Sequence, residues 1–421
     1  MKRSKKTICI FVQNNAAHDP RVSKEARIAS EYGYNTIVIG IYDRTLPAIE
    51  KKALYTIVRA KIFIFDNLRN VYRKFKIGSK HNSGNLAPTG FTSQRPNIAL
   101  RILWWFTSNF ERLFRNIVFV VAAKRYSPDI CHCSDLDTLL AGFVLNKIIG
   151  SKVVYDAHEL YESQSPHSPK LWKEILLFLE RRLARRVSIV IGVNEHIART
   201  ISERAKIRSY TEILNCPYHR HIDKPADDLC SVANGKIKVL FQGAYMPFRG
   251  LKELIESGQF IRDAVIILMG YGSMERELKR LVTRLKLGDK VFFLDPVPMD
   301  KLTEGAIGAD VGIIPYLPVC ANHLYCTPNK FFDYMHAGCA ILASDLPELR
   351  RLVINNNIGD LFDANNPKDI ANKINKLSEN KEELFAMKER SRTLAKERYY
   401  WQKEGLKLVD VYDKLLGLKD E

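Results

Sequence analysis

The stretch 236–272, KIKVLFQGAYMPFRGLKELIESGQFIRDAVIILMGYG, shows most directly how this chain folds. It predicts a strand over Lys236–Gln242, a helix over Leu251–Gly258 and a second strand over Ala264–Met269, followed by a glycine-containing turn. Short apolar strands that alternate with helices are typical of a parallel sheet covered on both faces. The stretch therefore predicts a doubly wound α/β domain.

The same alternation occurs twice along the chain. After the quoted stretch we predict helices over Met274–Leu285, Met299–Ala306 and Pro328–Ala337, and strands over Lys290–Leu294, Val311–Pro315 and Ala340–Ser344. The earlier series has strands over Thr7–Gln13, Asn35–Ile41, Asp129–His132, Lys152–Asp156 and Val187–Val193, and helices over Pro20–Tyr32, Asp137–Ile149 and Leu171–Arg186. Two such domains would place a ligand-binding cleft between the carboxyl ends of their strands.

The length of the chain agrees with two domains. At 421 residues and 48.3 kDa it exceeds what one hydrophobic core normally supports. We predict an N-terminal Rossmann-like domain over 1–220, a C-terminal Rossmann-like domain over 235–395 and a terminal helix within 396–421. The polar stretch Pro217–Asn234 is the predicted linker.

The composition excludes several classes of protein. With 46% hydrophobic and 27% charged residues, the chain is globular rather than disordered. No apolar window approaches the roughly 18–20 residues of a membrane-spanning helix. The first apolar run ends at Gln13, so no signal peptide is predicted. The eight cysteines form no CxxC pair, which favours a reduced, cytoplasmic protein without a zinc site.

Positive charge predicts anionic partners. The net charge is +18, and the window 51–125 alone holds 15 basic and two acidic residues. Within it, Ile98–Ala123 has the pattern of an amphipathic helix that carries Trp104 and Trp105. This pattern fits a core helix with a basic outer face, and it also fits a rim that rests on an anionic membrane. Nucleic acid is not a predicted partner, because no aromatic and basic strand platform is visible.

The run 326–338, CTPNKFFDYMHAG, predicts a ligand site at a helix N-terminus. Thr327 is a good N-cap, and Gly338 suits the position after the helix end. A helix that begins at the carboxyl edge of a sheet directs its N–H groups and positive dipole end at a ligand, and a diphosphate fits there. Lys330 adds a full charge, and Asp333 is placed about one turn further on, where it can accept hydrogen bonds from ribose hydroxyls.

Polar residues also follow two predicted strands. Gly243 comes directly after a strand, which lets the backbone approach a ligand, and Arg249 offers a guanidinium that matches phosphate oxygens. His158 follows the strand Lys152–Asp156 and would face the phosphate site across the cleft. A solvent-facing loop arginine and a structural histidine are the alternatives to these roles.

Together, these motifs resemble a known family. The runs HDPRVSKEA (18–26), YDAHEL (155–160), PNKFFDYM (328–335) and DLPEL (345–349) resemble glycosyltransferase family 4, the retaining nucleotide-sugar glycosyltransferases of the GT-B fold, in the branch of bacterial surface-polysaccharide assembly. The resemblance covers nearly the whole chain. It implies a donor held by the C-terminal domain, an acceptor held by the N-terminal domain, and a C-terminal helix that crosses back to the N-terminal domain.

The resemblance also assigns roles to residues by motif. It implies three catalytic residues: His158 near the donor sugar, and Arg249 and Lys330 at the diphosphate. The implied donor-binding residues are Gly243, Arg249, Thr327, Asn329, Lys330 and Asp333. Asp19 and Arg21 are assigned to the acceptor side from their position alone, because the glycine-rich loop expected after the first strand is replaced by 14–17.

Three positions depart from the family pattern. Ala244 stands where an arginine is usual, so the site has one cation fewer. Tyr325 replaces the first glutamate of a pair that contacts the sugar hydroxyls and the ribose, and Asp333 shortens the second. The first departure concerns the diphosphate, and the other two concern recognition of the sugar hydroxyls and of the ribose.

The predicted reaction is transfer of a sugar from a UDP- or GDP-sugar to an acceptor hydroxyl, with retention. The acceptor would be a lipid-linked glycan of O-antigen, capsule or exopolysaccharide at the inner membrane face. Arg249, Lys330 and the helix dipole would stabilise the leaving diphosphate, so neither a metal nor another cofactor is predicted. Two alternatives are a sugar-nucleotide epimerase of the same fold and a non-catalytic scaffold that binds nucleotide-sugar or membrane.

Overall fold

The computed structural model describes residues 6–17, 19–61, 113–164, 169–219, 229 and 235–418. The chain forms two compact units. The first comprises Met1–Asp156, Glu180–Val190 and Val409–Glu421, and the second comprises Ala157–Leu179 and Ile191–Leu408. The domain boundaries predicted from the sequence remain predictions.

The N-terminal sheet has eight strands in the order β3-β4-β2-β1-β5-β6-β7-β8. Its strands are β1 (Thr7–Phe11), β2 (Asn35–Ile41), β3 (Ile49–Lys51), β4 (Thr56–Ala60), β5 (Ile130–Ser134), β6 (Lys152–Ala157), β7 (Ile189–Gly192) and β8 (Tyr210–Glu212). The pairs β1 with β2, β1 with β5, β2 with β4 and β5 with β6 are parallel, whereas β3 pairs with β4 in antiparallel orientation. The middle strand β1 is almost fully buried, as a parallel sheet covered on both faces requires.

The helices of this part begin and end where the sequence provides caps. They are α1 (Pro20–Glu31), α4 (Leu136–Ile149), α5 (Lys170–Ala184), α6 (Glu195–Ala205) and a further helix over 113–124. The Asp19 carboxylate accepts a hydrogen bond from the Val22 amide at the start of α1, and Pro20 occupies its first turn. Gly150, with φ of 75°, ends α4.

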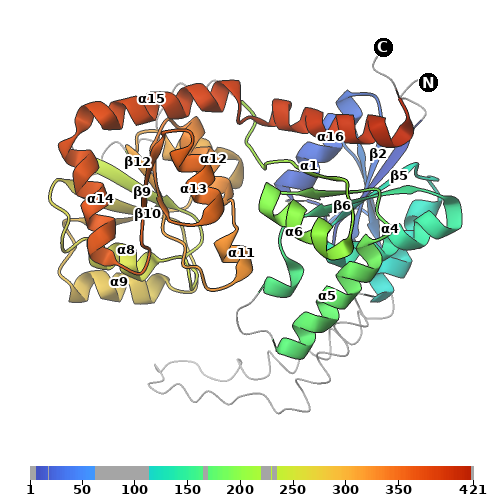
Figure 1. Cartoon of the computed structure of the whole chain (residues 1–421), viewed down its shortest axis with the longest axis horizontal. Helices are drawn as coiled ribbons and strands as arrows, with labels where there is room; N and C mark the ends of the chain where they lie inside the picture. Colours follow the sequence, from blue (N-terminus) through green and yellow to red (C-terminus); the bar gives the residue numbers. More distant parts are fainter. Residues whose placement is uncertain are drawn as a thin grey trace. The chain divides into compact units, whose positions relative to one another are not determined.

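The second sheet has six strands in the order β11-β10-β9-β12-β13-β14, and every recorded pair is parallel. Its strands are β9 (Ile237–Gln242), β10 (Ala264–Met269), β11 (Val291–Leu294), β12 (Val311–Ile314), β13 (Ala340–Ser344) and β14 (Gly359–Phe362). Helices cover the sheet (Figure 1). Because the strand order reverses between β9 and β12, a doubly wound sheet of this kind has its ligand crevice at their carboxyl ends.

The helices of the second sheet's domain follow the strands in alternation. They are α8 (Leu251–Ser257), α9 (Glu275–Arg284), α10 (Leu302–Ala306), α11 (Ala321–Leu324), α12 (Asn329–His336), α13 (Pro347–Ile354), α14 (Pro367–Glu379) and α15 (Lys381–Glu397). The last helix, α16 (Trp401–Leu416), begins in the second unit and ends in the first. In the described part of the chain, no helix has both the length and the apolar character needed to cross a membrane.

The predicted alternation of strands and helices is confirmed. The predicted bounds of β2, β10 and β13 match the structure residue for residue, and the ends of the remaining predicted strands differ by at most two residues. Of the predicted helix Ile98–Ala123, the part from 113 onward is helical and buries Phe119 and Ala123 in the core. Residues 62–112, which include Trp104 and Trp105, and most of the predicted linker lie outside the described residues.

Candidate active site

Gly243 lies where β9 ends, at the point of strand-order reversal. Its φ is 134°, a value that side chains rarely allow, and its N–H donates to the Met269 carbonyl at 2.9 Å. A Cβ placed on Gly243 would lie 3.2 Å from the Lys330 Nζ. The absence of a side chain at this position therefore lets the β9 loop pack directly against Lys330, so the structure brings two of the predicted donor residues together.

Arg249 is presented by a turn with unusual backbone angles. Phe248 and Gly250 on either side of it both have φ of 66°. A Cβ on Gly250 would lie 1.7 Å from the Pro315 carbonyl oxygen, so only glycine allows this approach. The turn places the Arg249 guanidinium carbon 4.1 Å from the centroid of the Tyr316 ring, directly after β12.

Lys330 points toward the same aromatic ring. Its Nζ lies 3.5 Å from the centroid of Phe241 and 5.4 Å from that of Tyr316. Such cation–π contacts stabilise a charge by roughly 0.5–2 kcal/mol, less than a carboxylate partner in a buried site would. Within the described ranges, neither Lys330 nor Arg249 forms an ion pair with a carboxylate at 4.0 Å or less.

Three other titratable groups near Arg249 and Lys330 are neutral at pH 7. Burial raises the pKa of Tyr316 to about 12 and that of Cys326 to about 12. Burial also lowers the pKa of His323. Burial and then the neighbouring Arg249 lower the pKa of Lys330 well below its ordinary value. These groups bring no negative charge to Arg249 and Lys330, so an anion would be stabilised beside the two side chains.

Lys330 lies in the first turn of helix α12. The helix begins at Asn329 after Pro328, which provides no side-chain cap. The prediction that Thr327 caps this helix is wrong, because Thr327 lies one residue too early, and its hydroxyl instead accepts from Asn194 Nδ2 at 3.1 Å. Among the described residues, the Asn329 and Lys330 amides have no hydrogen-bond acceptor, so they can donate to a ligand.

Asp333 lies one turn into α12. It is 9% exposed, and its Oδ1 accepts a hydrogen bond from the Thr303 hydroxyl of α10 at 2.9 Å. Asp333 also contributes to the electrostatic environment of Lys330, where its charge opposes the lowering of the lysine pKa. The contact with ribose predicted for Asp333 remains a prediction.

His158 follows the end of β6 in a segment that reaches the 316–323 loop. The Leu160 amide donates to Asn322 Oδ1 at 2.6 Å, and Asn322 Nδ2 donates to the Leu160 carbonyl at 3.0 Å. The next residue, His323, donates from Nδ1 to the Leu317 carbonyl at 3.0 Å, and the Leu317 amide donates to Phe248. One loop thus connects the His158 segment to the turn that presents Arg249. Sequence reasoning missed Asn322 and His323, since no motif marks them.

Tyr325 stands where the family pattern has a sugar-binding glutamate, and its side chain packs against a histidine. Its ring stacks on His196 at 5.0 Å with an interplanar angle of 18°, and its carbonyl accepts from Asn194 Nδ2 at 2.7 Å. His196 in turn contacts the buried carboxylate of Glu348. His196 thus connects the Tyr325 ring to the Glu348 carboxylate.

The two residues assigned to the acceptor side lie in the first unit. Asp19 caps α1 and accepts from Asn14 Nδ2 at 2.9 Å. Arg21 is 4% exposed, and its Nη2 and Nε donate to the two oxygens of Asp156 at 2.7 and 2.9 Å. Burial disfavours the charged guanidinium, but Asp156 and Glu25 outweigh this effect and raise the pKa of Arg21. These contacts describe structural roles, and the acceptor-side assignment remains a prediction.

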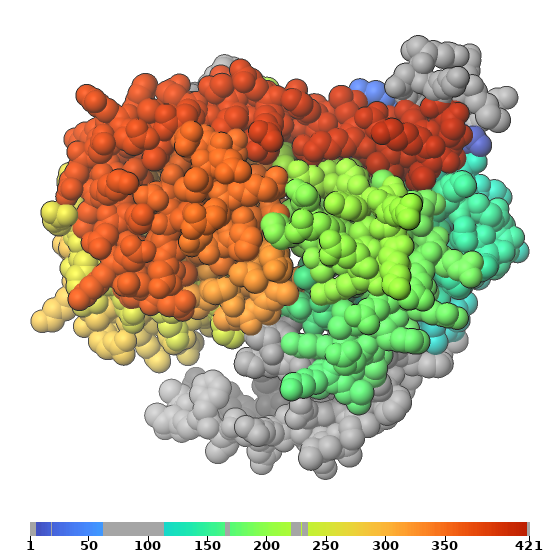
Figure 2. Space-filling view, viewed as in Figure 1, coloured from blue at the N-terminus to red at the C-terminus, as the bar shows by residue number. Residues whose placement is uncertain are grey.

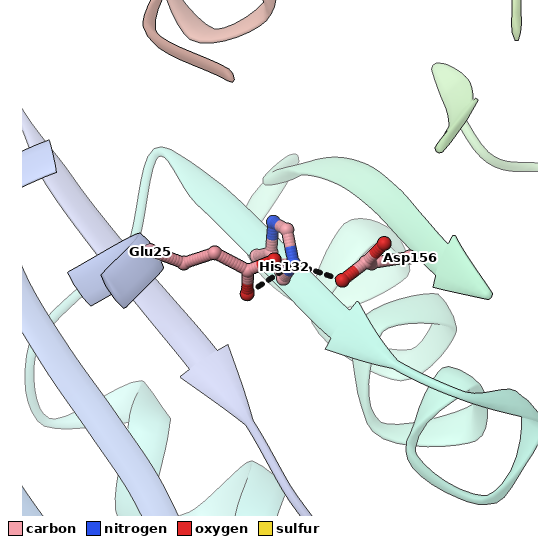
Figure 3. Close-up of side chains that lie close together, drawn as sticks. All are labelled: Glu25, His132 and Asp156. Atoms are coloured by element: carbon pink, nitrogen blue, oxygen red, sulfur yellow. Dashed lines mark ion pairs between the residues drawn. The ribbon is translucent and has the colours of Figure 1, made fainter. Parts of the chain in front are cut away.

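Glu25, His132 and Asp156 form a buried polar cluster (Figure 3), and Arg21 contacts its two carboxylates. His132 Nε2 lies 3.5 Å from a carboxylate oxygen of Glu25 and 3.5 Å from one of Asp156, and His132 Nδ1 is 2.9 Å from the Tyr412 hydroxyl of α16. Glu25, His132 and Asp156 together have the ligand types of a metal site. Because the guanidinium of Arg21 already binds both carboxylates, a further cation would be repelled there, and we assign no metal to the cluster.

The part of the chain that carries this site resembles known proteins. Residues 231–394 match the family model of Glycosyl transferases group 1, and this range contains Gly243, Arg249 and Lys330. An uncharacterized glycosyltransferase of Methanocaldococcus jannaschii is 24% identical over 187 residues. That alignment spans 43% of this chain and 46% of the relative, so it reaches about half of the relative's length.

Solved structures resemble the whole chain. Sucrose-phosphate synthase from Thermosynechococcus elongatus aligns with a TM-score of 0.72 at 16% identity, covering 98% of this chain and 100% of that one. HepE from Anabaena in complex with UDP aligns with a TM-score of 0.64 at 17% identity, covering 97% and 100%. The fold is that of the GT-B glycosyltransferases. Together with the family match, this likeness supports glycosyltransferase activity.

Proposed function

We propose that this protein is a retaining glycosyltransferase of family 4 that moves a sugar from a nucleoside-diphosphate donor to an acceptor hydroxyl. One observation carries the proposal. Arg249 and Lys330 share one tyrosine ring at the carboxyl edge of the second sheet and form no ion pair within the described residues. A diphosphate supplies the negative charge that this arrangement lacks.

The mechanism follows from the position of these charges. When the bond between the sugar C1 and the donor phosphate oxygen breaks, negative charge develops on the diphosphate. Arg249, Lys330 and the open amides at the start of α12 stabilise that charge, which lowers the barrier. The departing phosphate oxygen accepts the proton of the acceptor hydroxyl as the new bond forms on the same face of the sugar. His158 contacts the sugar near the leaving phosphate. No metal is needed in this scheme.

The donor is best sought among UDP-sugars. The HepE structure with a similar fold contains UDP, and the same protein with UDP-glucose aligns with a TM-score of 0.62 at 14% identity, covering 97% of this chain and 99% of that one. Asp333, held by Thr303, is the proposed ribose contact. GDP-sugars are the second class to test. Tyr325 stands in place of the family's glutamate, so recognition of the sugar hydroxyls depends on which residue takes over that contact.

The proposed acceptor is a lipid-linked glycan used in O-antigen, capsule or exopolysaccharide synthesis. The basic window 51–125 supports this assignment, because a cationic surface favours acceptors presented at an anionic membrane. The corresponding place of action is the cytoplasmic face of the inner membrane. Asp19 and Arg21, at the start of α1 after the first strand, are the proposed acceptor-side residues, and Arg21 would act there through the carboxylates that it binds.

A thermal-shift panel tests the donor assignment. UDP-, GDP-, ADP- and dTDP-sugars are added to the full chain, and the ligand that binds the folded state raises the apparent melting temperature. We expect one nucleotide class to give the largest shift and Arg249→Ala to reduce it. A full shift in Arg249→Ala, or no shift with any nucleotide, would contradict the proposal. Transfer assays with and without EDTA test metal independence, which predicts equal rates.

Tyr325 favours one competing function, a scaffold that binds nucleotide-sugar without transferring it. Such a protein would show the thermal shift but neither transfer to an acceptor nor slow hydrolysis of the donor. A sugar-nucleotide epimerase of the same fold would instead convert the donor with no acceptor present. Product analysis of the bound donor after prolonged incubation distinguishes both from the proposed transferase.

A further inference from the structure

Helix α5 exposes two large apolar side chains to solvent. Leu171 is 74% exposed and Phe178 is 66% exposed, and Leu179 beside them is 42% exposed. Because seven residues make almost two full turns of an α-helix, Leu171 and Phe178 lie along one line on its surface. Large side chains aligned in this way mark an interaction site more often than single exposed apolar residues do.

The end of the helix is strongly basic. Arg182 follows Phe178 by four residues on the same face, Arg181 lies beside it, and Arg185 and Arg186 follow the helix end at Ala184. All four arginines are exposed, and in the described part of the chain none has a recorded ion pair. A helix C-terminus is stabilised by a nearby cation, but four cations without acidic partners exceed what the helix dipole requires.

The opposite face of α5 fixes its orientation. Leu176, Glu180 and Ala184 are buried, and the Glu180 carboxylate accepts a hydrogen bond from the Tyr155 hydroxyl at 2.8 Å. Replacing the exposed residues would therefore leave the packing of the helix intact. In Figure 2 the green residues that include α5 lie on the face of the molecule that is shown.

We propose that α5 lies on the surface of a bilayer that contains anionic phospholipid. Leu171 and Phe178 enter the boundary between headgroups and acyl chains, and the arginine cluster contacts lipid phosphates. With 15 residues the helix is about 22 Å long, shorter than the ~30 Å hydrocarbon core, so it lies in the interface and does not span it. This inference rests on the proposed function in its choice of a lipid-linked acceptor, and it uses none of the residues of the donor site.

Vesicle sedimentation tests the proposal with the full chain. Vesicles of phosphatidylcholine alone are compared with vesicles that also contain phosphatidylglycerol, at low and at high salt. We expect binding to the anionic vesicles only, weakening as salt rises. The double substitution Leu171→Ser with Phe178→Ser should lower the partition coefficient at least tenfold, and Arg182→Ser with Arg185→Ser should lower it about thirtyfold and reduce the salt dependence.

Two matched controls come from the same chain. Phe385→Ser removes an apolar side chain that is 64% exposed on α15. Arg280→Ser with Arg284→Ser removes two exposed cations from α9, a helix without large exposed apolar residues. Both variants should bind vesicles within twofold of the unmodified chain. If the control variants lost as much vesicle binding as the α5 variants, the assignment of the membrane contact to α5 would be wrong.

Three further outcomes are informative. Equal binding to both kinds of vesicle, or no binding, would overturn the proposal. A change in mass in solution that depends on Leu171 and Phe178 would identify a second copy of the chain as the partner and would also overturn it. Thermal shifts with nucleotide-sugars separate the two proposals: a shift without vesicle binding removes only the membrane contact, and vesicle binding without any shift removes only the proposed function.

Discussion

Two arginines of the chain, Arg21 and Arg249, lie under opposite electrostatic conditions. Arg21 is buried in the first unit, and two carboxylates bind its guanidinium. Arg249 lies half-buried in the second unit, where it faces an aromatic ring and lies near a second cation, Lys330. The charge of Arg21 is neutralised within the protein. The charge of Arg249 is not neutralised by any described residue.

This difference separates a structural cation from a binding cation. A buried charge that has its partners contributes to a specific fold, and removing one partner is costly because the other is left buried. Two nearby cations without carboxylates repel each other, which lowers the stability of the ligand-free protein but favours an anionic ligand. Substitutions at the two sites should therefore have opposite consequences for stability and for activity.

The largest expected effect is on stability, at Arg21. Arg21→Met leaves Asp156 and Glu25 buried without their guanidinium, so we expect the free energy of unfolding to fall by about 3–5 kcal/mol. Chemical denaturation measures this change. The matched control is Arg27→Met on the same helix, whose ion pair with Glu31 is largely exposed and whose loss should cost less than about 1 kcal/mol. Equal effects of both substitutions would remove the distinction drawn for Arg21.

Arg249→Ala should show the reverse pattern. Loss of one preorganised cation at the leaving diphosphate should raise the barrier of the transfer step by about 2–4 kcal/mol. The free energy of unfolding should change by less than about 1 kcal/mol, because only a cation–π contact is lost. Steady-state kinetics and denaturation measure the two effects, with Arg276→Ala on the exposed face of α9 as control. Normal turnover by Arg249→Ala would remove this residue from the mechanism.

Lys330→Met should weaken diphosphate binding by about 1.5–3 kcal/mol while it stabilises the ligand-free protein. The pKa of Lys330 is lowered by burial and by Arg249, which means that folding makes its charged form less favourable. Removing the charge removes this cost. Melting temperatures with and without nucleoside diphosphate measure both quantities. If the variant is less stable than the unmodified chain in the absence of ligand, the charge of Lys330 does not destabilise the ligand-free protein and this explanation is wrong.

The free energy of unfolding should depend on pH through Lys330, by up to about 1.4 kcal/mol per pH unit. Between the lowered pKa of Lys330 in the folded chain and its ordinary value of 10.5, the unfolded chain binds more protons. Stability of the ligand-free protein should therefore rise with pH in this window, while diphosphate affinity falls. Titration calorimetry at several pH values measures the affinity. Lys330→Arg keeps its charge and should flatten the affinity profile, and an unchanged slope in that variant would exclude Lys330 as the titrating group.

The sequence predicted the parallel sheets well because their strands are apolar and bounded by turn residues. It did not predict β3 and β4, which lie at or next to the start of the basic window, nor β8, nor β14, whose strand of four residues contains Gly359 and Asp360. Strands this short carry little periodicity.

The candidate site was predictable only in part. Gly243, Arg249 and Lys330 follow recognisable motifs, and the structure brings them together. Tyr316 was not predicted, because a ring that contacts both cations depends on how the loop after β12 folds. The pairing of Arg21 with Asp156, residues 135 positions apart, could not be predicted from a local pattern either.

The most direct measurement is a calorimetric comparison of two ligands. The nucleoside diphosphate that gives the largest thermal shift and its monophosphate are each titrated into the unmodified chain and into Arg249→Ala. If Arg249 and Lys330 bind the second phosphate, the unmodified chain prefers the diphosphate at least tenfold, and Arg249→Ala loses most of that preference while binding the monophosphate almost unchanged. Equal affinities for both ligands in the unmodified chain would contradict the account.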